Sequence, residues 1–565
     1  MMVQSRQPTF LELFTPKLVT TLQGHYRLSD FRADAVAGLT VAIVALPLSM
    51  AIAIASGVTP DRGLYAAIIG GFIVSALGGS RFQIGGPAGA FIVLVAATVE
   101  QHGVEGLILA TLLSGLILLA IGLLRLGTFI KYIPYPVTVG FTAGIAVIIF
   151  VSQIKELLGL TLAGREPGQL VPKLQALVEA LPTVNWAAVL TAATAIGLIV
   201  SVRRYRPHWP AFLIAVGLAS ALAWAANLPI ETIGSRFGGI PRALPAPQLP
   251  ALSLEKLVAV LPAALSFALL GGIESLLSAV VADSMSGRRH RSNCELVAQG
   301  AANVASALFG GLCVTGTIAR TATNVRSGAR SPVAGMLHAL FLLLFMLAAA
   351  PLASFIPLAA LAAVLAVVAW NMAEKHEFAT LIRASRGDAV VLLATFLLVV
   401  FRDLTEGILV GFGLGTLLFL HRMAQAVDVE RPQPMIEEDR PDTHAVGPDA
   451  PGPYNGSAAS DPDVVVCRIS GAFFFGAAAA VGAALDRIGE HPKTYIIDFS
   501  GVPFLDSTAA ATIEGFARKA RWQGTTVYIA GAQPTVRRVL LTHGVKPPGV
   551  RFRSSVASAL TAAER

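Results

Sequence analysis

Charge is what this sequence lacks most. Asp, Glu, Lys and Arg make up 13% of its 565 residues, whereas soluble domains carry about 25%. Hydrophobic residues make up 55%. A soluble fold cannot hide that much apolar side chain, because much of any folded surface must face water. The shortage of charge therefore excludes an ordinary soluble protein and indicates that most of the chain folds in a lipid bilayer.

Cysteine is scarce as well. The three cysteines, Cys294, Cys313 and Cys467, lie far apart and form no CxxC pair. Neither a disulfide framework nor a zinc site is predicted, and we expect no resident metal or cofactor. All three are expected in packed interior. The N-terminus lacks the pattern of a signal peptide, so the first apolar run is expected to remain as a membrane span.

Aromatic residues are few, at 7%, but Gly is abundant with 53 residues and Pro with 33. This mixture suits closely packed membrane helices with breaks, because small residues let backbones approach. The net charge of +8 does not indicate nucleic-acid binding, since the basic residues fall in short loops between apolar runs. Membrane topology explains that placement better.

Apolar runs long enough to cross a bilayer, about 20 residues each, recur along the chain. The clearest are Ala35–Ala55, Gly106–Leu124, Val137–Val151, Trp186–Val202, Ala211–Ala226, Val258–Val281, Met336–Leu352, Ala359–Trp370, Val390–Phe401 and Ile408–Leu420. Shorter segments lie between them at Leu64–Leu77, Phe91–Val99, Leu296–Leu312 and Thr315–Asn324. Together they predict a polytopic α-helical membrane domain of about fourteen segments.

Basic residues in every other loop test this count. Counting from an intracellular N-terminus, the alternate loops hold Arg81, Arg125, Arg203, Arg288, Arg330, Arg383 and Arg422. The opposite loops are poor in basic residues or balance them with acids, as at Arg402 and Glu406. The pattern predicts an even number of crossings, with both termini cytoplasmic, in the plasma (inner) membrane.

Two of the short segments are broken at membrane depth. Gln83–Ala90 places glycines and a proline there, and Thr315–Asn324 is polar and follows Gly310 and Gly311. Non-helical backbone survives at this depth only where it lines protein or a wet cavity. One broken segment in each half predicts an inverted-repeat transporter whose central site faces helix N-termini, which favour an anion. The alternative is two kinked structural helices.

Two opposite charges fall inside the predicted membrane domain. Glu274 lies in an otherwise apolar helix, where a carboxylate must be paired, protonated or bound to a cation. We predict that it carries a proton or binds Na⁺; the alternative is a hydrogen bond between helices. Arg320 is its natural counter-charge and would hold the anion; the alternative is a structural or snorkelling Arg paired with Glu274. Hydroxyls that would assist are those of Ser275, Ser278, Thr315, Thr317 and Thr321.

The periodicity changes after His421, and strand and helix signals alternate beyond a stretch rich in Pro, Gly, Ser, Asp and Glu. We expect strands at Val464–Ile469, Tyr495–Phe499 and Val527–Ala530, and helices at Ala477–Ile488, Ser507–Lys519, Thr535–Thr542 and from Val556. The predicted domains are a cytoplasmic segment 1–30, a transport domain 31–425, a flexible linker 426–461 and a soluble α/β domain 462–565. The soluble part shows no catalytic motif, so we predict no enzyme.

These motifs together resemble the SulP anion permeases, a family of sulfate and bicarbonate transporters that includes prestin. The resemblance spans nearly the whole chain. Its carriers are Leu46–Ala51, Gly63–Tyr65, Gly86–Pro87, Glu274–Ser278, Thr315–Asn324 and Pro332–Gly335, and the tail resembles a STAS domain through Asp498–Val502 and Asp506–Thr508. It implies two inverted repeats of seven segments arranged as core and gate domains, a homodimer, and a STAS domain that binds a cytoplasmic protein partner.

The resemblance also assigns site residues. The anion would be held by Leu48, Ile52, Gly86, Pro87, Ala88, Gly89, Ala319, Arg320 and Thr321, and the coupling ion by Glu274, Ser278, Thr315 and Thr317. The regulatory positions are Asp506, Ser507 and Thr508, and Thr508 falls where related anti-sigma-antagonist proteins are phosphorylated. Leu48 and Ala88 are aliphatic where many members carry polar or aromatic residues, so substrate preference does not carry over.

The sequence thus predicts a secondary active transporter of a small anion, with sulfate first by family analogy, coupled to H⁺ or Na⁺ through Glu274. Bicarbonate and C4-dicarboxylates remain alternatives as substrates, and an uncoupled exchanger or channel as a mechanism. A membrane-tethered signalling scaffold is the third reading. A scaffold gives no reason for the costly charged side chains of Glu274 and Arg320 to lie inside the membrane. Membrane lipid and the anion are the expected partners, and nucleic acid is not.

Overall fold

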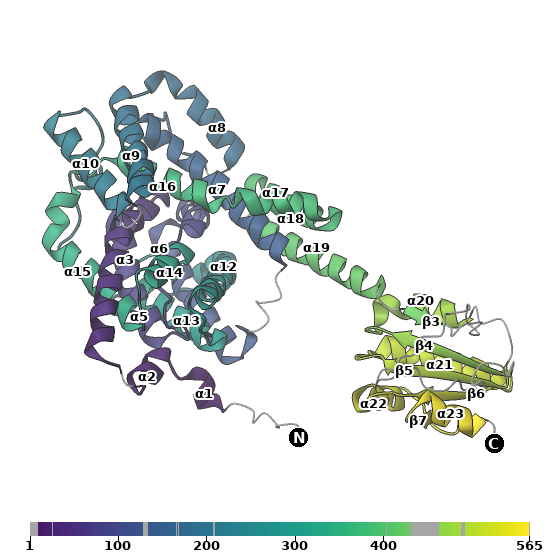
Figure 1. Ribbon diagram of the computed structural model, residues 1–565. Coiled ribbons are helices and arrows are strands. Elements are labelled where there is room, and N and C mark those ends of the chain that lie inside the picture. The colour runs from purple at the N-terminus through teal and green to yellow at the C-terminus, as the bar shows by residue number, and fades with distance from the viewer. Residues whose placement is uncertain are drawn as a thin grey trace, which may run out of the picture. The chain divides into compact units, whose positions relative to one another are not determined.

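The structure is a computed structural model that describes residues 9–24, 26–127, 134–164, 166–167, 169–206, 209–402, 404–425, 428–430, 463–486 and 492–563. The chain divides into two compact units, Met1–Gly413 and Leu414–Arg565, and each is described by itself. The first is helical and the second contains a sheet (Figure 1). Most of the predicted linker, residues 431–461, lies outside the described residues.

The first half of the helical unit follows the predicted order of segments. Its elements are α1 (Phe10–Phe14), α2 (Lys17–Leu22), α3 (Leu28–Ala55), α4 (Pro60–Tyr65), the π-helical turn η1 (Ala66–Gly70), α5 (Gly71–Leu77), β1 (Gly85–Gly86), η2 (Gly89–Phe91), α6 (Ile92–Leu123), α7 (Tyr135–Leu158), α8 (Leu170–Glu179), η4 (Leu181–Thr183), α9 (Trp186–Tyr205), α10 (Ala211–Ala225) and α11 (Ile233–Phe237). Helix α6 is broken at Gly103, whose backbone is not helical. Its two parts correspond to the two segments predicted at Phe91–Val99 and Gly106–Leu124.

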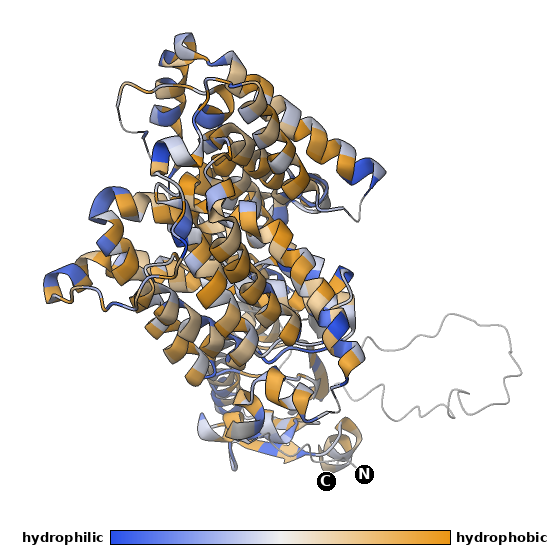
Figure 2. Ribbon diagram, turned by 90° about the vertical axis from the view of Figure 1, so that its left-hand side faces the viewer, coloured by the Kyte–Doolittle hydropathy of each residue, from blue (hydrophilic) through white to orange (hydrophobic). Residues whose placement is uncertain are grey.

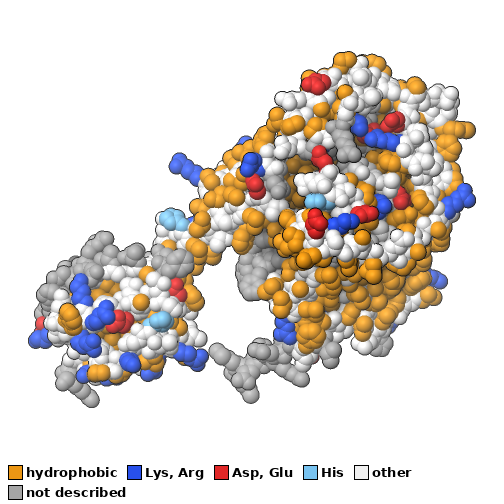
Figure 3. All heavy atoms as spheres, turned by 180° about the vertical axis from the view of Figure 1, so that it is seen from behind, with side chains coloured by type: hydrophobic (Ala, Val, Ile, Leu, Met, Phe, Trp, Pro, Cys, Tyr) orange, Lys and Arg blue, Asp and Glu red, His pale blue; other side chains and the backbone are white. Residues whose placement is uncertain are grey.

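The second half repeats the broken pattern. Its elements are α12 (Leu254–Ser286), α13 (Ser292–Leu308), β2 (Thr315–Gly316), α14 (Ile318–Arg326), α15 (Val333–Ala353), α16 (Leu358–Met372), α17 (Lys375–Ala384), α18 (Arg386–Phe401) and α19 (Leu404–Gln425). Within the described residues, eight helices are long and apolar enough to cross a membrane. Figure 2 shows the hydrophobic residues along these helices, and Figure 3 shows them covering much of one face. The chain is a multi-pass membrane protein.

The helices of this unit pack as two groups. Helices α3, α5, α6, α12, α13, α14 and α15 pack on one another, and α7, α9, α10, α16 and α18 form the second group. Small residues permit the close contacts: a Cβ atom on Gly38 of α3 would lie 2.5 Å from the carbonyl oxygen of Ala334 on α15. The two groups agree with the expected core and gate arrangement, while the inverted repeats remain a prediction.

The second unit is a small α/β domain. Its strands are β3 (Asp428–Glu430), β4 (Val464–Ser470), β5 (Thr494–Gly501), β6 (Thr526–Ala530) and β7 (Val550–Arg553), and its helices are α20 (Phe475–Asp486), α21 (Ser507–Trp522), α22 (Pro534–Thr542) and α23 (Val556–Ala563). The sheet order is β3-β4-β5-β6-β7, with β3 antiparallel and the other pairs parallel. Every predicted strand and helix of this domain is present within one to three residues.

Two strands of this second unit were not predicted. Strand β3 lies inside the range expected to be linker, and β7 is a short strand whose alternate residues are polar. The three cysteines are all free and buried, as expected.

Candidate functional site

The two broken segments meet at the centre of the helical unit. Strands β1 and β2 pair antiparallel, with Gly85 opposite Gly316 and Gly86 opposite Thr315. Beyond the ladder, the Thr317 N–H donates to the carbonyl oxygen of Ile84 over 3.0 Å. A helix follows each strand, η2 with α6 after β1 and α14 after β2. Because the strands are antiparallel, these helices begin at the crossing and run in opposite directions, so two positive helix ends flank one point.

Glycine is required where the segments cross. A Cβ atom on Gly86 would lie 2.2 Å from Nη1 of Arg320, and one on Gly316 would lie 1.6 Å from Nε2 of Gln83. Both distances are far below van der Waals contact. The glycines of the two segments therefore allow a guanidinium and an amide to lie directly against the backbone.

Arg320 is the cation at this crossing. It lies on the first turn of α14 and is 1% exposed. Its Nη2 donates to Oγ of Ser49 and to the carbonyl oxygen of Pro87, each over 3.2 Å. Nε and Nη1 have no hydrogen-bond partner within the described residues. A buried guanidinium with two unsatisfied nitrogens is costly, so the geometry calls for an anion at that edge.

Glu274 lies on α12, which passes beside the crossing. Its Oε2 atom is buried and has no hydrogen-bond partner among the described residues. No ion pair joins it to Arg320 in the described structure, so the two do not form the direct pair expected of a structural role. The carboxylate is left open to a proton or a cation.

The predicted hydroxyls tie α12 to the broken segments. Oγ1 of Thr315 donates to the carbonyl oxygen of Gly271 over 2.9 Å, and Oγ of Ser278 donates to Oγ1 of Thr321 over 3.1 Å. Oγ1 of Thr321 also accepts the Ile84 N–H. The hydroxyl protons of Thr315 and Ser278 are thus used to join elements, and lone pairs of their oxygens remain for a cation. The hydroxyl of Thr317 donates to the Ile84 carbonyl over 3.3 Å.

Of the predicted anion-binding residues, Gly86 and Pro87 lie directly against the Arg320 guanidinium. Leu48 and Ile52 on α3 and Ala88 before η2 are 6%, 3% and 3% exposed, whereas Ala319 is exposed. A Cβ atom on Gly89 would lie 3.4 Å from Cδ1 of Ile149 on α7. The predicted site therefore lies in the region where η2 and α6 contact α7.

A charged cavity lies between the same two groups of helices. It has a volume of about 480 Å³, is bounded by Ala51 and Ala96 on one side and Gln153 and Leu365 on the other, and reaches charged residues at its rim. Those rim residues are Glu100, Lys155, Glu156, Glu166, Lys173 and Arg236. They belong to α6, α7, α8, α11 and the loop before α8, and we call this cavity the vestibule.

Sequence reasoning missed two polar residues of the site. Ser49 accepts a hydrogen bond from Nη2 of Arg320, and its only signal was a lone hydroxyl in the apolar stretch 41–55 of α3. Gln83 donates from Nε2 to Oγ of Ser275 over 2.9 Å, while its Oε1 is buried without a partner. An amide at the head of the first broken segment was the available signal for Gln83. Its unsatisfied oxygen is a further candidate cation ligand.

The regulatory positions lie at the start of α21 in the second unit. Oδ1 of Asp506 accepts the Ala509 N–H over 2.9 Å and so caps the helix. Ser507 and Thr508 are exposed. In the described part of the chain, no three His, Cys, Asp or Glu side chains are grouped to hold a metal ion.

Comparison with known proteins gives concordant matches for both units. The model described as "Sulfate permease family" matches residues 31–395, and that of the STAS domain matches residues 457–559. The chain is 40% identical over 523 residues to the "Putative sulfate transporter YvdB" of Bacillus subtilis, covering 92% of this chain and 95% of YvdB. It is 32% identical over 531 residues to the "Bicarbonate transporter BicA" of Synechocystis, covering 91% and 90% of the two chains.

Two solved structures share the fold. That of the murine Slc26a9 anion transporter in the inward-facing state superposes with a TM-score of 0.85 at 19% identity, covering 100% of this chain and 96% of that one. The transmembrane domain of a cyanobacterial BicA gives 0.61 at 31% identity, covering 69% of this chain and 98% of that one. The first shows the fold alone, and the second also shares sequence.

Proposed function

Because the chain belongs to the sulfate permease family, we propose that it is a secondary active transporter of sulfate and that the anion binds at Arg320, between β1 and β2. The observation that carries this proposal is the buried guanidinium with two nitrogens unsatisfied at a point flanked by two helix N-termini. A transported anion would satisfy those nitrogens when bound, and its departure would leave them unpaired. The free-energy cost of leaving those nitrogens unpaired favours either rapid rebinding of an anion or a conformational change of the binding site.

Coupling to a cation is proposed through Glu274. Its buried Oε2 lacks a partner, and three hydroxyls and the Oε1 atom of Gln83 surround the same part of α12. These are the hard oxygen ligands that Na⁺ takes, and a carboxylate alone suffices for H⁺. A cation there would offset the carboxylate and make the positive charge of Arg320 available to the anion.

Bicarbonate is the second candidate substrate. The chain is 32% identical to BicA, named as a bicarbonate transporter, and shares the fold of its transmembrane domain. The apolar walls of the proposed site would be the buried aliphatic residues Leu48, Ile52 and Ala88. Small oxyanions fit this description, and C4-dicarboxylates are the larger alternative.

The remaining parts of the account are proposals of the same kind. Both termini are assigned to the cytoplasm of a cell with the chain in its plasma (inner) membrane, on the pattern of basic loops. The domain limits 1–30, 31–425, 426–461 and 462–565 and the homodimer stay predictions. The STAS domain is proposed to bind a protein partner near the exposed Ser507 and Thr508.

Arg320 provides the first test of the anion site. Uptake of labelled sulfate and bicarbonate into proteoliposomes is measured for the wild type, Arg320→Gln and Arg320→Lys. Loss of a charge-assisted hydrogen bond is worth about 1.5–3 kcal/mol, so Arg320→Gln is expected to weaken anion affinity by about tenfold or more. Arg204→Gln, which removes an exposed charge at the end of α9, is the control and should transport normally. Normal uptake by Arg320→Gln would contradict the proposed site.

A further inference from the structure

A second cavity lies on the side of the helical unit that carries the N-terminus. Its volume is about 450 Å³, and it is formed by α2, the start of α3, the loop after α5 and the ends of α12 and α14. Three arginines from three separate loops line it: Arg81, Arg288 and Arg330. The neutral polar side chains Thr21, Tyr26 and Ser286 complete much of the lining. This cavity is distinct from the crossing of β1 and β2 and from the vestibule.

The cations in this cavity exceed the acids that face it. Arg330 pairs through Nη1 with Oδ1 of Asp30 over 2.6 Å. Arg81 is half-buried, and its guanidinium has no hydrogen-bond or ion-pair partner within the described residues. Burial, with the nearby Arg288 and Arg291, lowers the pKa of Arg81 below its ordinary value. The region therefore holds unneutralised positive charge, which favours an anionic ligand.

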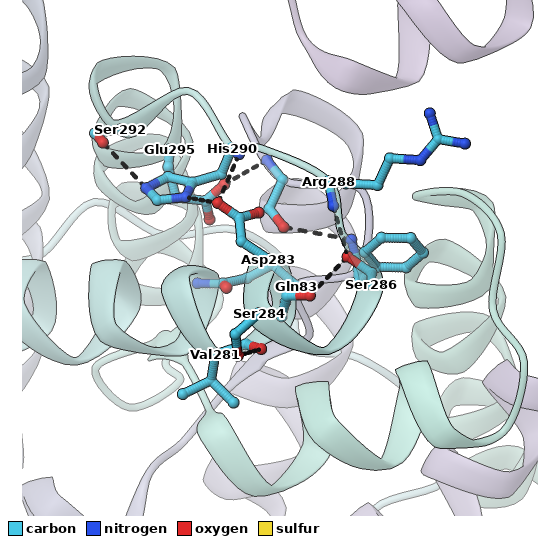
Figure 4. Close-up of polar contacts among 12 residues, drawn as sticks. Gln83, Val281, Asp283, Ser284, Ser286, Arg288, His290, Ser292 and Glu295 are labelled. Carbon is cyan, nitrogen blue, oxygen red and sulfur yellow. Dashed lines mark hydrogen bonds and ion pairs between the residues drawn. The ribbon is translucent and has the colours of Figure 1, made fainter. Parts of the chain in front are cut away.

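The nearest acid on α12 does not neutralise Arg288. The carboxylate of Asp283 accepts hydrogen bonds through Oδ2 from the backbone and Nδ1 of His290, at 3.0 and 2.6 Å. Nε2 of that imidazole lies 3.0 Å from Oγ of Ser292. Figure 4 shows this chain of polar groups, with the side chain of Arg288 extending away from it. The carboxylate of Asp283 is thus hydrogen-bonded within the loop that joins α12 and α13, and the guanidinium of Arg288 is available to a ligand in the cavity.

The walls of the cavity are held in place by backbone contacts. The Lys17 N–H donates to the carbonyl oxygen of Gly78 over 2.9 Å, and Nη1 of Arg291 donates to the carbonyl oxygen of Thr15. These bonds fix the N-terminal helices over the ends of α5 and α13. Membrane topology alone requires basic residues on this side, but exposed ones such as Arg289 meet that need. A half-buried, unpartnered Arg81 inside a cavity does not follow from topology.

We propose that this cavity binds a phosphate-type oxyanion, held by Arg81, Arg288 and Arg330. Three guanidinium groups suit the several oxygens of a phosphate, and basic pockets between helices on the cytoplasmic side are where lipid headgroups bind. The ligand is either the headgroup of an anionic lipid or the free ion, since both offer the same chemistry. Bound there, it would join the N-terminal segment to the ends of α12 and α14, the helices that carry Glu274 and Arg320.

The test uses thermal unfolding of the full chain in lipid nanodiscs. In one arm the discs contain neutral phosphatidylcholine and inorganic phosphate is titrated at constant ionic strength. In the other, phosphatidylglycerol is added to the discs without phosphate. We expect one ligand to raise Tm of the wild type by a few degrees, and Arg81→Gln and Arg288→Gln to lose that rise. Arg289→Gln, one residue along and outside the cavity, should keep it.

The two arms separate the sources of the ligand. A rise with phosphate in neutral discs identifies the free ion, and a rise with phosphatidylglycerol alone identifies the headgroup. The rise must persist in Arg320→Gln, which excludes binding at the transport site. No rise in either arm, or an equal rise in Arg288→Gln, overturns the proposal. Because Arg288 is exposed, its substitution is not expected to prevent folding. Because this test measures thermal unfolding and not transport, its outcome is independent of the outcome of the Arg320 uptake test.

Discussion

At the scale of single residues, the site depends on side chains that the membrane domain leaves unsatisfied. Arg320, Glu274 and Gln83 each bury a polar atom without a partner in the described structure. Other buried groups of this unit differ: the carboxylate of Asp34 accepts hydrogen bonds from Tyr26 and from the backbone and side chain of Ser331. Among the described residues, a buried polar atom without a partner is also found on Thr111, Gln299, Asn324 and His338. At the crossing, the unsatisfied groups include a guanidinium and a carboxylate, which are the most costly to leave unpaired and therefore favour a ligand there.

Gly86 offers a residue-scale prediction. Gly86→Ala places a methyl group where Nη1 of Arg320 lies, so the guanidinium must move away from Ser49 and Pro87. We expect anion uptake in proteoliposomes to fall by about tenfold or more, as for loss of a charge-assisted hydrogen bond, while the protein still folds. Gly197→Ala on α9, where nothing lies within 4 Å of the added carbon, is the matched control. Wild-type uptake by Gly86→Ala would show that the position of Arg320 does not matter.

At the scale of elements, the same residue types that break helices build the site. The sequence is informative where composition changes abruptly, as at Gln83–Ala90 and Thr315–Asn324, and both were expected to be broken. It is uninformative about which strands pair. The antiparallel ladder between β1 and β2 joins residues more than two hundred positions apart, and no local pattern encodes it. The place of Gln83 against Ser275 follows from that pairing and was missed for the same reason.

In the second unit, an ion pair joins neighbouring strands. Nε of Arg468 on β4 lies 2.9 Å from Oδ2 of Asp498 on β5, and the Ser500 N–H donates to Oδ1 over 2.9 Å. Burial alone would raise the pKa of Asp498, but the hydrogen bonds from Ser500 and Arg468 together hold it below its ordinary value. The carboxylate therefore stabilises this domain when it is ionised.

The pH dependence follows from the lowered pKa. The stabilisation is complete above the ordinary Asp pKa of about 3.9 and is lost as the pH falls through the lower folded value. Urea unfolding of a soluble fragment covering residues 426–565 should show Asp498→Asn less stable than the wild type at neutral pH. The difference should vanish in acid. A difference that stays constant down to about pH 2, well below that ordinary value, would mean that the charge of Asp498 does not contribute.

At the scale of the whole molecule, composition together with the spacing of apolar runs and basic loops predicted the class of the protein and its helical membrane domain. A chain with 13% charge and alternating basic loops has few options besides a polytopic membrane protein. The resemblance to the SulP family is confirmed by the match over residues 31–395 and by relatives of similar length. The short strands β3 and β7 were missed because three or four residues carry too little periodicity to be read.

The cation-rich cavity shows a limit of sequence reading at this scale. Arg81, Arg288 and Arg330 were each assigned to the topology of their own loops. Only the fold brings the three loops to one cavity at the ends of the helices that carry the proposed transport site. Residues that satisfy one rule in the sequence can therefore serve a second role once the chain is folded.

The central claim is that anion movement is coupled through Glu274, and gradient-driven uptake tests it most directly. Proteoliposomes containing the wild type or Glu274→Gln are given labelled sulfate, bicarbonate or fumarate under an imposed pH or Na⁺ gradient. The account predicts that one anion accumulates against its own gradient in the wild type. Glu274→Gln should abolish accumulation while downhill exchange continues. Uptake that stays downhill in the wild type and is unchanged in Glu274→Gln would contradict coupling and leave an exchanger or channel.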